Sequence, residues 1–307
     1  MPPYAPGRQA GLVALSGASG LLGARLTPAL VGEGYGVLPL VRRPPGAGEA
    51  GWDPLHGRID LTRLAGVTAA VHLAGESIAA GRWTEGVKQR IRESRTRGTR
   101  LLAESLARLT PRPSVLVSAS AIGIYGDRGD EVLTEESHLG ADFLAATGRE
   151  WEAATAPAAE AGIRVVRLRF GIVLAREGGA LPRMAQPFLL GAGGPIGNGR
   201  QWMSWVAIED AVAVVLAALA DPAYSGAINA VAPEPVRNAD FGKALGRVLH
   251  RPSLLPVPAF ALRLLFGEMA DVALLASQRV VPTRLAALGF RHRYPALEPA
   301  LRHALGR

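Results

Sequence analysis

Cysteine is absent from this 307-residue chain, and histidine is sparse and scattered. Without cysteine the protein has no disulfide, no thiolate metal ligand and no cysteine nucleophile. The histidines lie far apart in the sequence and show no metal-ligand spacing. We therefore expect no metal site. The six histidines are His56, His72, His138, His250, His292 and His303.

Lysine is almost absent as well, because only Lys88 and Lys243 among the 34 basic residues are lysines. The net charge of +8 therefore comes from arginines, which are spread along the chain. A nucleic-acid-binding protein would be expected to cluster its basic residues on one face. We expect no nucleic-acid partner.

Long apolar runs are also missing, although 49% of the residues are hydrophobic and 20% are charged. No run approaches the roughly 18–20 residues that a membrane-spanning helix needs. Residues 1–10 lack the apolar stretch of a secretory signal. The composition is that of a globular protein, for which we expect a cytoplasmic location and no membrane partner.

Short apolar strands alternate with helical segments through the first half of the chain. This rhythm predicts an α/β protein with a doubly wound parallel sheet, the Rossmann fold. The predicted strands are Gly11–Ser16, Tyr35–Val41, Ala69–Leu73, Ser114–Ser118 and Ile163–Leu168, and the predicted helices are Leu21–Val31, Trp83–Arg108 and Asp142–Ala161.

The rhythm changes after Phe170, and the last part of the chain, from Val236, is mostly helical and interrupted by prolines. A chain of this length has room for about two folding units. We expect a cofactor-binding Rossmann domain over residues 11–175, to which residues 204–232 return. Residues 176–203 and 233–307 are expected to form a smaller, mostly helical C-terminal lobe that binds substrate.

A glycine-rich segment, Ser16 to Gly23, follows the first predicted strand and opens the first helix. Its glycines at positions 17, 20 and 23 would allow a tight turn, a close approach to a pyrophosphate and close packing of helix on strand. A glycine triplet alone is weak evidence, and an ordinary tight turn is the alternative. In this strand-to-helix context the segment predicts a dinucleotide site.

Two arginines, Arg42 and Arg43, follow the second predicted strand. NAD-specific folds usually carry an acidic residue there, which binds the ribose 2′-hydroxyl. Guanidinium groups suit a 2′-phosphate instead. The position therefore favours NADP(H), unless both arginines are merely solvated.

Several motifs together resemble one family. The glycine loop resembles that of short-chain dehydrogenase/reductases, and His72–Gly75 resembles the segment of their extended members that passes over the cofactor. Further motifs narrow the resemblance to an atypical branch, the "epimerase family" proteins with their own C-terminal domain, over residues 11 to about 304. These motifs are Trp52–Pro54, Leu73–Glu76, Gly81–Trp83, Ser118–Gly126, Gly193–Gln201, Gly267–Met269, Ser277–Pro282 and Gly289–Phe290.

The resemblance implies an NADP(H)-binding protein in which Arg42 meets the adenosine end of the cofactor. It also implies that Leu73 and Ala74 line the cofactor and that Arg95 contacts it. The alternative for Arg95 is a solvated position on a basic helix. The expected cofactor-binding residues are Gly17, Ser19, Gly20, Leu21, Leu22, Gly23, Arg42, Arg43, Leu73, Ala74, Gly75, Arg95 and Ser118.

The catalytic pair of standard short-chain dehydrogenases, Tyr-x-x-x-Lys, is missing from this sequence. The pair normally supplies a tyrosine of lowered pKa as acid or base. Three other candidates remain: Ser120 past the fourth strand, Tyr125 and Glu76. Ser120 could instead cap a turn. Tyr125 is expected to pack its ring with the hydroxyl facing solvent, and Glu76 could be an ordinary surface carboxylate.

Gln201, Trp202 and Trp205 follow a glycine-rich stretch and could form a substrate wall, with the indoles as flat apolar surfaces. Two tryptophans are, however, also typical of a protein core. Relatives tend to carry histidine where this chain has Ala207, so we expect no histidine-dependent step at that position.

These features favour an NADP(H)-dependent oxidoreductase or epimerase-like enzyme acting on a small polar substrate. The alternative is a non-catalytic NADP(H)-binding regulator, suggested by a weak analogy to distant relatives linked to cell division. The sequence leaves the oligomeric state open, with a homodimer as one option.

Overall fold

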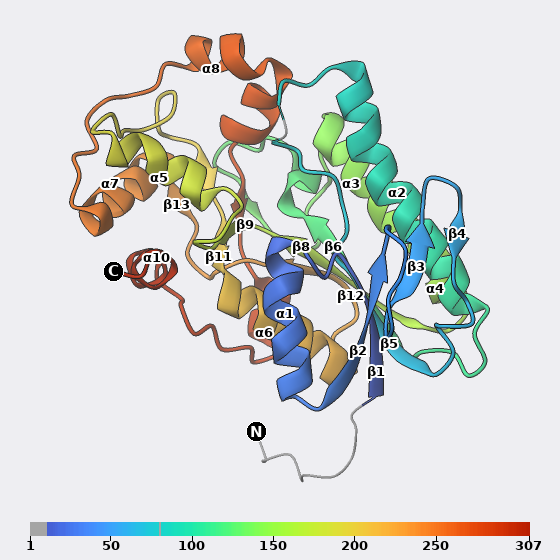
Figure 1. The fold of residues 1–307 in the computed structure, drawn as a ribbon. Helices are drawn as coiled ribbons and strands as arrows, with labels where there is room; N and C mark the ends of the chain where they lie inside the picture. The colour runs from blue at the N-terminus through green and yellow to red at the C-terminus, as the bar shows by residue number, and fades with distance from the viewer. Residues whose placement is uncertain (1–10, 80) are drawn as a thin grey trace.

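The centre of the fold is an eight-stranded sheet, described by a computed structural model that covers residues 11–79 and 81–307 (Figure 1). Its strand order is β12-β8-β6-β5-β1-β2-β3-β4, and all neighbouring pairs are parallel except β3 with β4. This confirms the predicted doubly wound parallel sheet. The strands are β1 (Gly11–Ser16), β2 (Tyr35–Val41), β3 (Ala50–Asp53), β4 (Arg58–Ile59), β5 (Val67–His72), β6 (Val115–Ala121), β8 (Arg164–Phe170) and β12 (Gly226–Ala230).

Helices cover both faces of the sheet, and each face has its own apolar core. On one face Leu26 and Leu30 of α1 and Val214 of α6 pack on Val13 and Val166 of the sheet. On the other face α2, α3 and α4 cover the strands, as Figure 1 shows. These helices are α1 (Leu21–Gly32), α6 (Ile208–Ala220), α2 (Glu85–Ala107), α3 (Phe143–Ala153) and α4 (Ala156–Glu160).

Two predicted elements differ from the structure. The single helix expected over Asp142–Ala161 is divided into α3 and α4. Pro157 stands in the first turn of α4, where its missing N–H does no harm, whereas it could not continue an uninterrupted helix. The link between the second and third predicted strands contains the hairpin β3–β4, which is too short for periodicity to reveal.

The C-terminal region is mostly helical and has a separate core, in which Trp205, Phe188, Phe241 and Leu301 are buried. Short strand pairs β9–β11, β10–β13 and β7–β14 lie between this region and the main sheet. The exact division into domains stays a prediction. The remaining elements are β7 (Val132–Leu133), β9 (Ile172–Leu174), α5 (Leu181–Leu189), β10 (Trp202–Met203), β11 (Trp205–Ala207), β13 (Val236–Arg237), α7 (Asn238–Leu249), α8 (Ala259–Phe266), β14 (Arg279–Val280), α9 (Thr283–Ala287) and α10 (Leu297–Leu305).

The strand order reverses at β1, because the chain builds β2 and β3 on one side of it and then β5, β6, β8 and β12 on the other. In open parallel sheets ligands bind at such a switch point, outside the carboxyl ends of the strands. A ligand is therefore expected at the turns that follow β1 and β5. No helix in the described part of the chain is both long and apolar enough to cross a membrane.

Candidate functional site

The glycine loop after β1 forms a tight turn into α1. Gly17 has φ +73°, and its carbonyl accepts a 2.9 Å hydrogen bond from Gly20 N. A Cβ added at Gly23 would overlap that carbonyl oxygen, so Gly23 is required for the close packing of α1 on the loop. Gly20 and Ser19 are exposed, and α1 begins there without a side-chain cap or an acidic residue in its first turn. The N–H groups at this helix end are therefore available to an anion.

The turn after β5 is held against this loop by a buried serine–histidine pair. Ser16 Oγ lies 2.6 Å from His72 Nδ1 and accepts hydrogen bonds from Leu73 N and Ala74 N at 3.2 and 3.4 Å. The Ser16 hydroxyl and the His72 ring thus share a buried hydrogen bond, and His72 Nε2 is buried with no partner among the described residues. Burial lowers the pKa of His72 to about 4, so the ring is neutral at physiological pH. The pair fixes the turn, and the sequence analysis did not identify it.

The two turns touch directly. A Cβ built at Gly17 would lie 2.9 Å from Leu73 C and Ala74 N, which only glycine avoids. The expected cofactor-lining residues Leu73, Ala74 and Gly75 thus lie beside the glycine loop. Of the other predicted residues, Leu21 and Leu22 are half-buried in the first turn of α1. Ser118 is buried in β6, where it pairs in register with His72.

Arg95 of α2 reaches toward the turn after β5. Its guanidinium lies 5.1 Å from the centre of the Trp151 ring and donates a 3.0 Å hydrogen bond to the Ile91 carbonyl. Burial lowers the pKa of Arg95 to about 10, while the charge of Glu76 acts in the opposite direction. Arg95 is therefore half-buried beside Gly75 and Glu76 rather than solvated on the outer face of the helix.

A hollow of about 410 Å³ opens at the carboxyl end of β2, and Arg42, Arg43 and Arg58 are among the residues that line it. Arg43 donates two hydrogen bonds, of 2.8 and 2.5 Å, to the Glu49 carboxylate. Arg42 and Arg58 are exposed and have no ion-pair partner among the residues described. Sequence reasoning missed Arg58, because only the β3–β4 pairing, which sets Asp53 opposite Arg58, brings it to this place.

Acidic groups also line this hollow, but each already has partners. The Asp53 carboxylate accepts from His56 Nδ1 at 2.6 Å and from the backbone N–H groups of Leu55 and His56. The Asp60 carboxylate accepts from Arg63 N and pairs with the Arg63 side chain at 3.7 Å. Arg42 and Arg58 are therefore the charged groups of this hollow whose side chains have no ion-pair or hydrogen-bond partner in the described structure.

The segment after β9 lies over the first turns of α1. Glu177 pairs with Arg25 at 2.5 Å, and a Cβ built at Gly179 would lie 3.0 Å from Leu21 Cδ2. Both charged side chains are about half exposed, so this contact is a weak one. It places residues 177–179 beside the start of α1.

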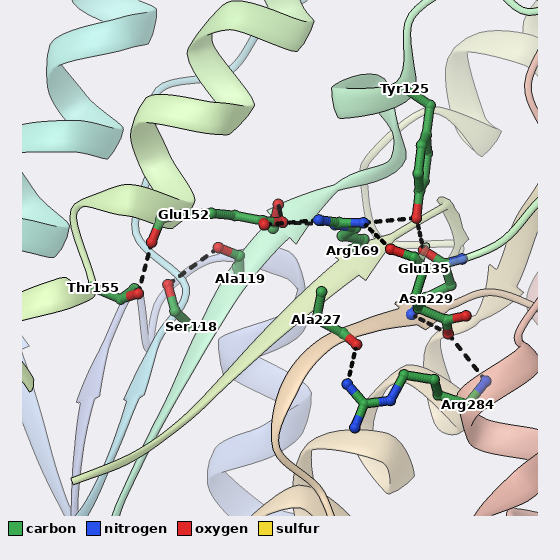
Figure 2. A network of polar contacts seen from close by, with 11 residues as sticks. Ser118, Ala119, Tyr125, Glu135, Glu152, Thr155, Arg169, Ala227, Asn229 and Arg284 are labelled. Carbon is green, nitrogen blue, oxygen red and sulfur yellow. Dashed lines mark hydrogen bonds and ion pairs between the residues drawn. The ribbon is translucent and has the colours of Figure 1, made fainter. Parts of the chain in front are cut away.

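Figure 2 shows a polar network in which Tyr125, Glu152 and Arg169 meet. Ser120, near the end of β6, is buried and belongs to the same network. Ser120 Oγ donates to Glu152 Oε1 at 2.8 Å, and Arg169 donates to both oxygens of the same carboxylate at 2.8 and 2.9 Å. Burial lowers the pKa of Arg169, but its hydrogen bonds to Glu152 and the charge of Glu152 raise it more, and the net change is upward. The attraction between Arg169 and the Glu152 carboxylate, together with these hydrogen bonds, offsets part of the cost of burying both groups.

The Tyr125 hydroxyl donates to Asn229 Oδ1 at 2.7 Å and accepts from Arg169 Nη1 at 2.9 Å. The side chain is fully buried, so the expectation that its hydroxyl faces solvent is wrong. Burial raises the pKa of Tyr125 above that of free tyrosine. The phenol therefore stays protonated, in contrast to a tyrosine that acts as a base.

The expected substrate wall is only partly preserved. Trp205 is completely buried in the C-terminal core, and its Nε1 donates to the Glu234 carbonyl at 3.2 Å, so its indole is a core residue. Trp202 lies between the guanidiniums of Arg237 and Arg279, whose carbons are 4.3 and 4.4 Å from its ring centre. Gln201 is buried and donates to the Ile196 carbonyl at 3.1 Å. The roles of Gln201 and Trp202 stay predictions.

Metal ligands do not gather in the structure: within residues 11–79 and 81–307, no three histidine, aspartate or glutamate side chains are placed to hold an ion.

The chain is similar to known proteins over almost its whole length. The NAD dependent epimerase/dehydratase family matches residues 13–230, and a domain of unknown function, DUF1731, matches residues 257–304. Epimerase family protein Mb2239 of Mycobacterium bovis is 42% identical over 297 residues, which cover 96% of this chain and 98% of that protein.

Two solved structures are also similar. The human epimerase family protein SDR39U1, solved with NADPH, is 32% identical, with a TM-score of 0.87 and coverage of 96% of this chain and 99% of that one. The nucleoside-diphosphate sugar epimerase of Corynebacterium glutamicum is 42% identical with a TM-score of 0.81; the match covers 96% of this chain but 58% of that one. These similarities confirm the resemblance seen in the sequence motifs. The chain belongs to the NAD dependent epimerase/dehydratase family, as an epimerase family protein of the atypical short-chain dehydrogenase/reductase type.

Proposed function

We propose that this protein is an NADP(H)-dependent oxidoreductase or epimerase-like enzyme that acts on a small polar substrate. The observation that carries the proposal is the hollow at the carboxyl end of β2, which the guanidiniums of Arg42 and Arg58 line. β2 is the neighbour of β1, the strand that leads into the glycine loop. A dinucleotide whose pyrophosphate lies at the start of α1 would extend its adenosine ribose toward this hollow.

The arginines favour a 2′-phosphate over a free 2′-hydroxyl. A charge-assisted hydrogen bond contributes about 1.5–3 kcal/mol, and a planar guanidinium can give two to one phosphate. Because Arg43 already donates two hydrogen bonds to Glu49, Arg42 and Arg58 are better placed to bind the 2′-phosphate. The NADPH in the structure of the human relative supports this preference.

The site offers several groups for chemistry next to a nicotinamide, which when bound supplies or accepts a hydride. Ser120 lies at the end of β6, where side chains face the reacting end of the cofactor in this fold class. Its hydroxyl could polarise a substrate oxygen if it leaves Glu152, which would keep both hydrogen bonds from Arg169. Tyr125, with its raised pKa and buried hydroxyl, is suited to hold Arg169 in place rather than to transfer a proton.

A proton must still be supplied, because the Tyr-x-x-x-Lys pair is missing. Glu76, half-buried beside Arg95 at the turn after β5, is our candidate, with water or the substrate itself as alternatives. Turnover is therefore expected to be slow. The proposal includes a small-molecule substrate and a cytoplasmic location, and no nucleic-acid partner.

The second candidate is a non-catalytic NADP(H)-binding regulator. The observation in its favour is that both candidate hydroxyls already donate hydrogen bonds within the protein, Ser120 to Glu152 and Tyr125 to Asn229. Such groups hold a structure together even when no substrate reacts there.

Cofactor binding and turnover separate these possibilities. Titrations with NADPH and with NADH, monitored by the absorbance of the cofactor, should give a lower dissociation constant for NADPH. A screen of aldehydes, quinones and nucleotide sugars should then show oxidation of bound NADPH. Tight NADPH binding without any turnover would support the regulator, and equal dissociation constants for the two cofactors would contradict the proposed NADP(H) preference.

A further inference from the structure

A second hollow of about 410 Å³ lies near the β12 edge of the sheet. It is bounded by α3, α4, β8 and the start of β12, and Arg164, Arg167 and Gly226 are among its lining residues. In the strand order, β6 and β5 stand between β8 and β1, the strand that leads into the glycine loop. The hollow is therefore a different place from the glycine loop.

Three arginines meet around this hollow without a carboxylate partner. Arg164, Arg167 and Arg284 form no ion pair within the described part of the chain. Arg164 donates to the carbonyls of Ala218 and Tyr224 at 2.8 and 2.6 Å. Arg284 Nη1 donates to the Ala227 carbonyl at 2.8 Å, as Figure 2 shows. Carbonyl groups satisfy these two guanidiniums as donors but do not neutralise their charge.

Arg167 differs from its neighbours because its side chain has no acceptor in the described structure. Its Nε is buried, with no hydrogen-bond partner. A buried donor of a charged group is costly unless an acceptor satisfies it. The Arg167 side chain can therefore donate hydrogen bonds to an acceptor bound in the hollow that it lines.

Glycine at position 226 allows the guanidiniums of Arg167 and Arg284 to approach the same stretch of backbone. Gly226 has φ +70°, and a Cβ built there would lie 3.1 Å from Arg284 Nη1 and 3.8 Å from Arg167 Nη2. The two guanidiniums thus approach the same backbone position from two elements, and their like charges repel each other. An anion between them would relieve this repulsion.

The carboxylates nearby leave an excess of positive charge, because Arg164, Arg167 and Arg284 face only Asp221 and Glu135 among the described residues, while Glu152 is paired with Arg169. Glu135 Oε1 accepts from Arg284 N and Asn229 N, and its Oε2 is buried without a partner in the described structure. Glu152 lines the hollow, but Ser120 and Arg169 occupy its two oxygens. Asp221 acts on Arg164 through its charge, and its Oδ1 accepts from Ala223 N. The local excess of positive charge is therefore left for a ligand.

We propose that this hollow binds the oxyanion group of a small metabolite, either a phosphate monoester or a carboxylate, with Arg167 as its main ligand. The planar guanidinium matches both groups with two parallel hydrogen bonds. The hollow is larger than one oxyanion, which leaves room for the body of the metabolite beside Thr155, Ala156 and Ala159. This inference does not rest on the proposed cofactor or reaction.

Thermal denaturation and calorimetric titration with inorganic phosphate, at ionic strength held constant with sodium chloride, test the site. Phosphate should raise the melting temperature of the wild-type protein in a saturable way. Arg167→Gln should weaken phosphate binding at least tenfold, and Arg167→Lys should weaken it less. Arg291→Gln removes one charge from an exposed arginine elsewhere and should leave the response unchanged.

Phosphate could also bind at the start of α1, and Gly20→Val separates the two places. If the response persists in Gly20→Val and is lost in Arg167→Gln, the hollow lined by Arg167 is the site that binds phosphate. The proposal would be overturned if the phosphate response were lost in Gly20→Val alone, or if Arg167→Gln responded to phosphate as the wild type does. It would also be overturned if the wild type showed no saturable response, since water would then be the only occupant of the hollow. The same titration with malonate in place of phosphate tests whether the site binds carboxylates as well as phosphate. If Arg167→Gln does not fold, Arg284→Gln takes its place in the comparison.

Discussion

Ser120 and Arg169 meet at one carboxylate, because Ser120 Oγ donates to Glu152 Oε1 and Arg169 donates to both Glu152 oxygens. Ser120 is therefore oriented by a buried ion pair from two other elements, α3 and β8. To donate to a substrate oxygen the hydroxyl must turn away from Glu152, whose carboxylate would keep both hydrogen bonds from Arg169. The arrangement leads to our first prediction.

Ser120→Ala should reduce any NADPH-linked turnover by more than Tyr125→Phe does. A hydroxyl aimed at a developing oxyanion in a water-poor site contributes about 2.7–4 kcal/mol, or roughly 10²–10³-fold in rate. Tyr125→Phe removes a buried hydrogen bond and should mainly lower stability, by about 1–3 kcal/mol. Steady-state rates on a substrate found by the screen, with urea denaturation of both variants, make the comparison. If Ser120→Ala turns over like the wild type, Ser120 has only a structural role.

Arg42→Ala should weaken NADPH binding by about 10- to 100-fold and leave NADH binding unchanged, since only NADPH carries the 2′-phosphate. Arg58→Ala should act in the same direction, because Arg58 lines the same hollow. Fluorescence titration of both cofactors gives the dissociation constants, and Arg291→Ala serves as the matched control. Parallel losses for NADPH and NADH would show that the arginines do not read the 2′-phosphate.

Gly20→Val should abolish cofactor binding and leave the fold largely intact. Gly20 is exposed and its φ of −76° suits any residue, so the fold should tolerate a valine if the Gly17 carbonyl oxygen, 3.2 Å from the added Cβ, shifts slightly. Its branched side chain would instead fill the space in front of the α1 N–H groups. Circular dichroism and calorimetric titration check both halves of the prediction. Retained NADPH binding would show that the loop is only a turn.

The buried His72 should make the protein less stable in mild acid. Its pKa falls from 6.5 to about 4 on folding, so the native state favours the neutral ring. This contribution is fully present above pH 6.5 and is lost as the pH falls toward 4. The free energy of unfolding should drop by about 2 kcal/mol between pH 7 and pH 5 from this group alone.

Urea denaturation at the two pH values measures that drop. His72→Gln should remove this part of the pH dependence, whereas His138→Gln, which changes an exposed ring, should preserve it. An unchanged slope in His72→Gln would mean that other groups cause the acid sensitivity.

Local signals in the sequence were sufficient for the parallel sheet and the glycine loop. The alternation of apolar strands with helices depends on side-chain periodicity, and the requirement for glycine at positions 17 and 23 depends on a turn within one short segment. The position of Arg42 just after β2 could likewise be read from the chain. These features are set by neighbouring residues, which is why they were predictable.

Tertiary structure alone decided the contacts between distant segments. Ser16 and His72 meet because β1 and β5 pair in register, and Glu152 and Arg169 meet because α3 packs against the sheet beside β8. Trp205 became a core residue, and Arg58 and Arg167 came to line separate hollows, through the same kind of packing. Pattern and composition reveal which residues can be buried or charged. Which of them meet depends on strand register and helix packing, since these bring together residues far apart in the chain.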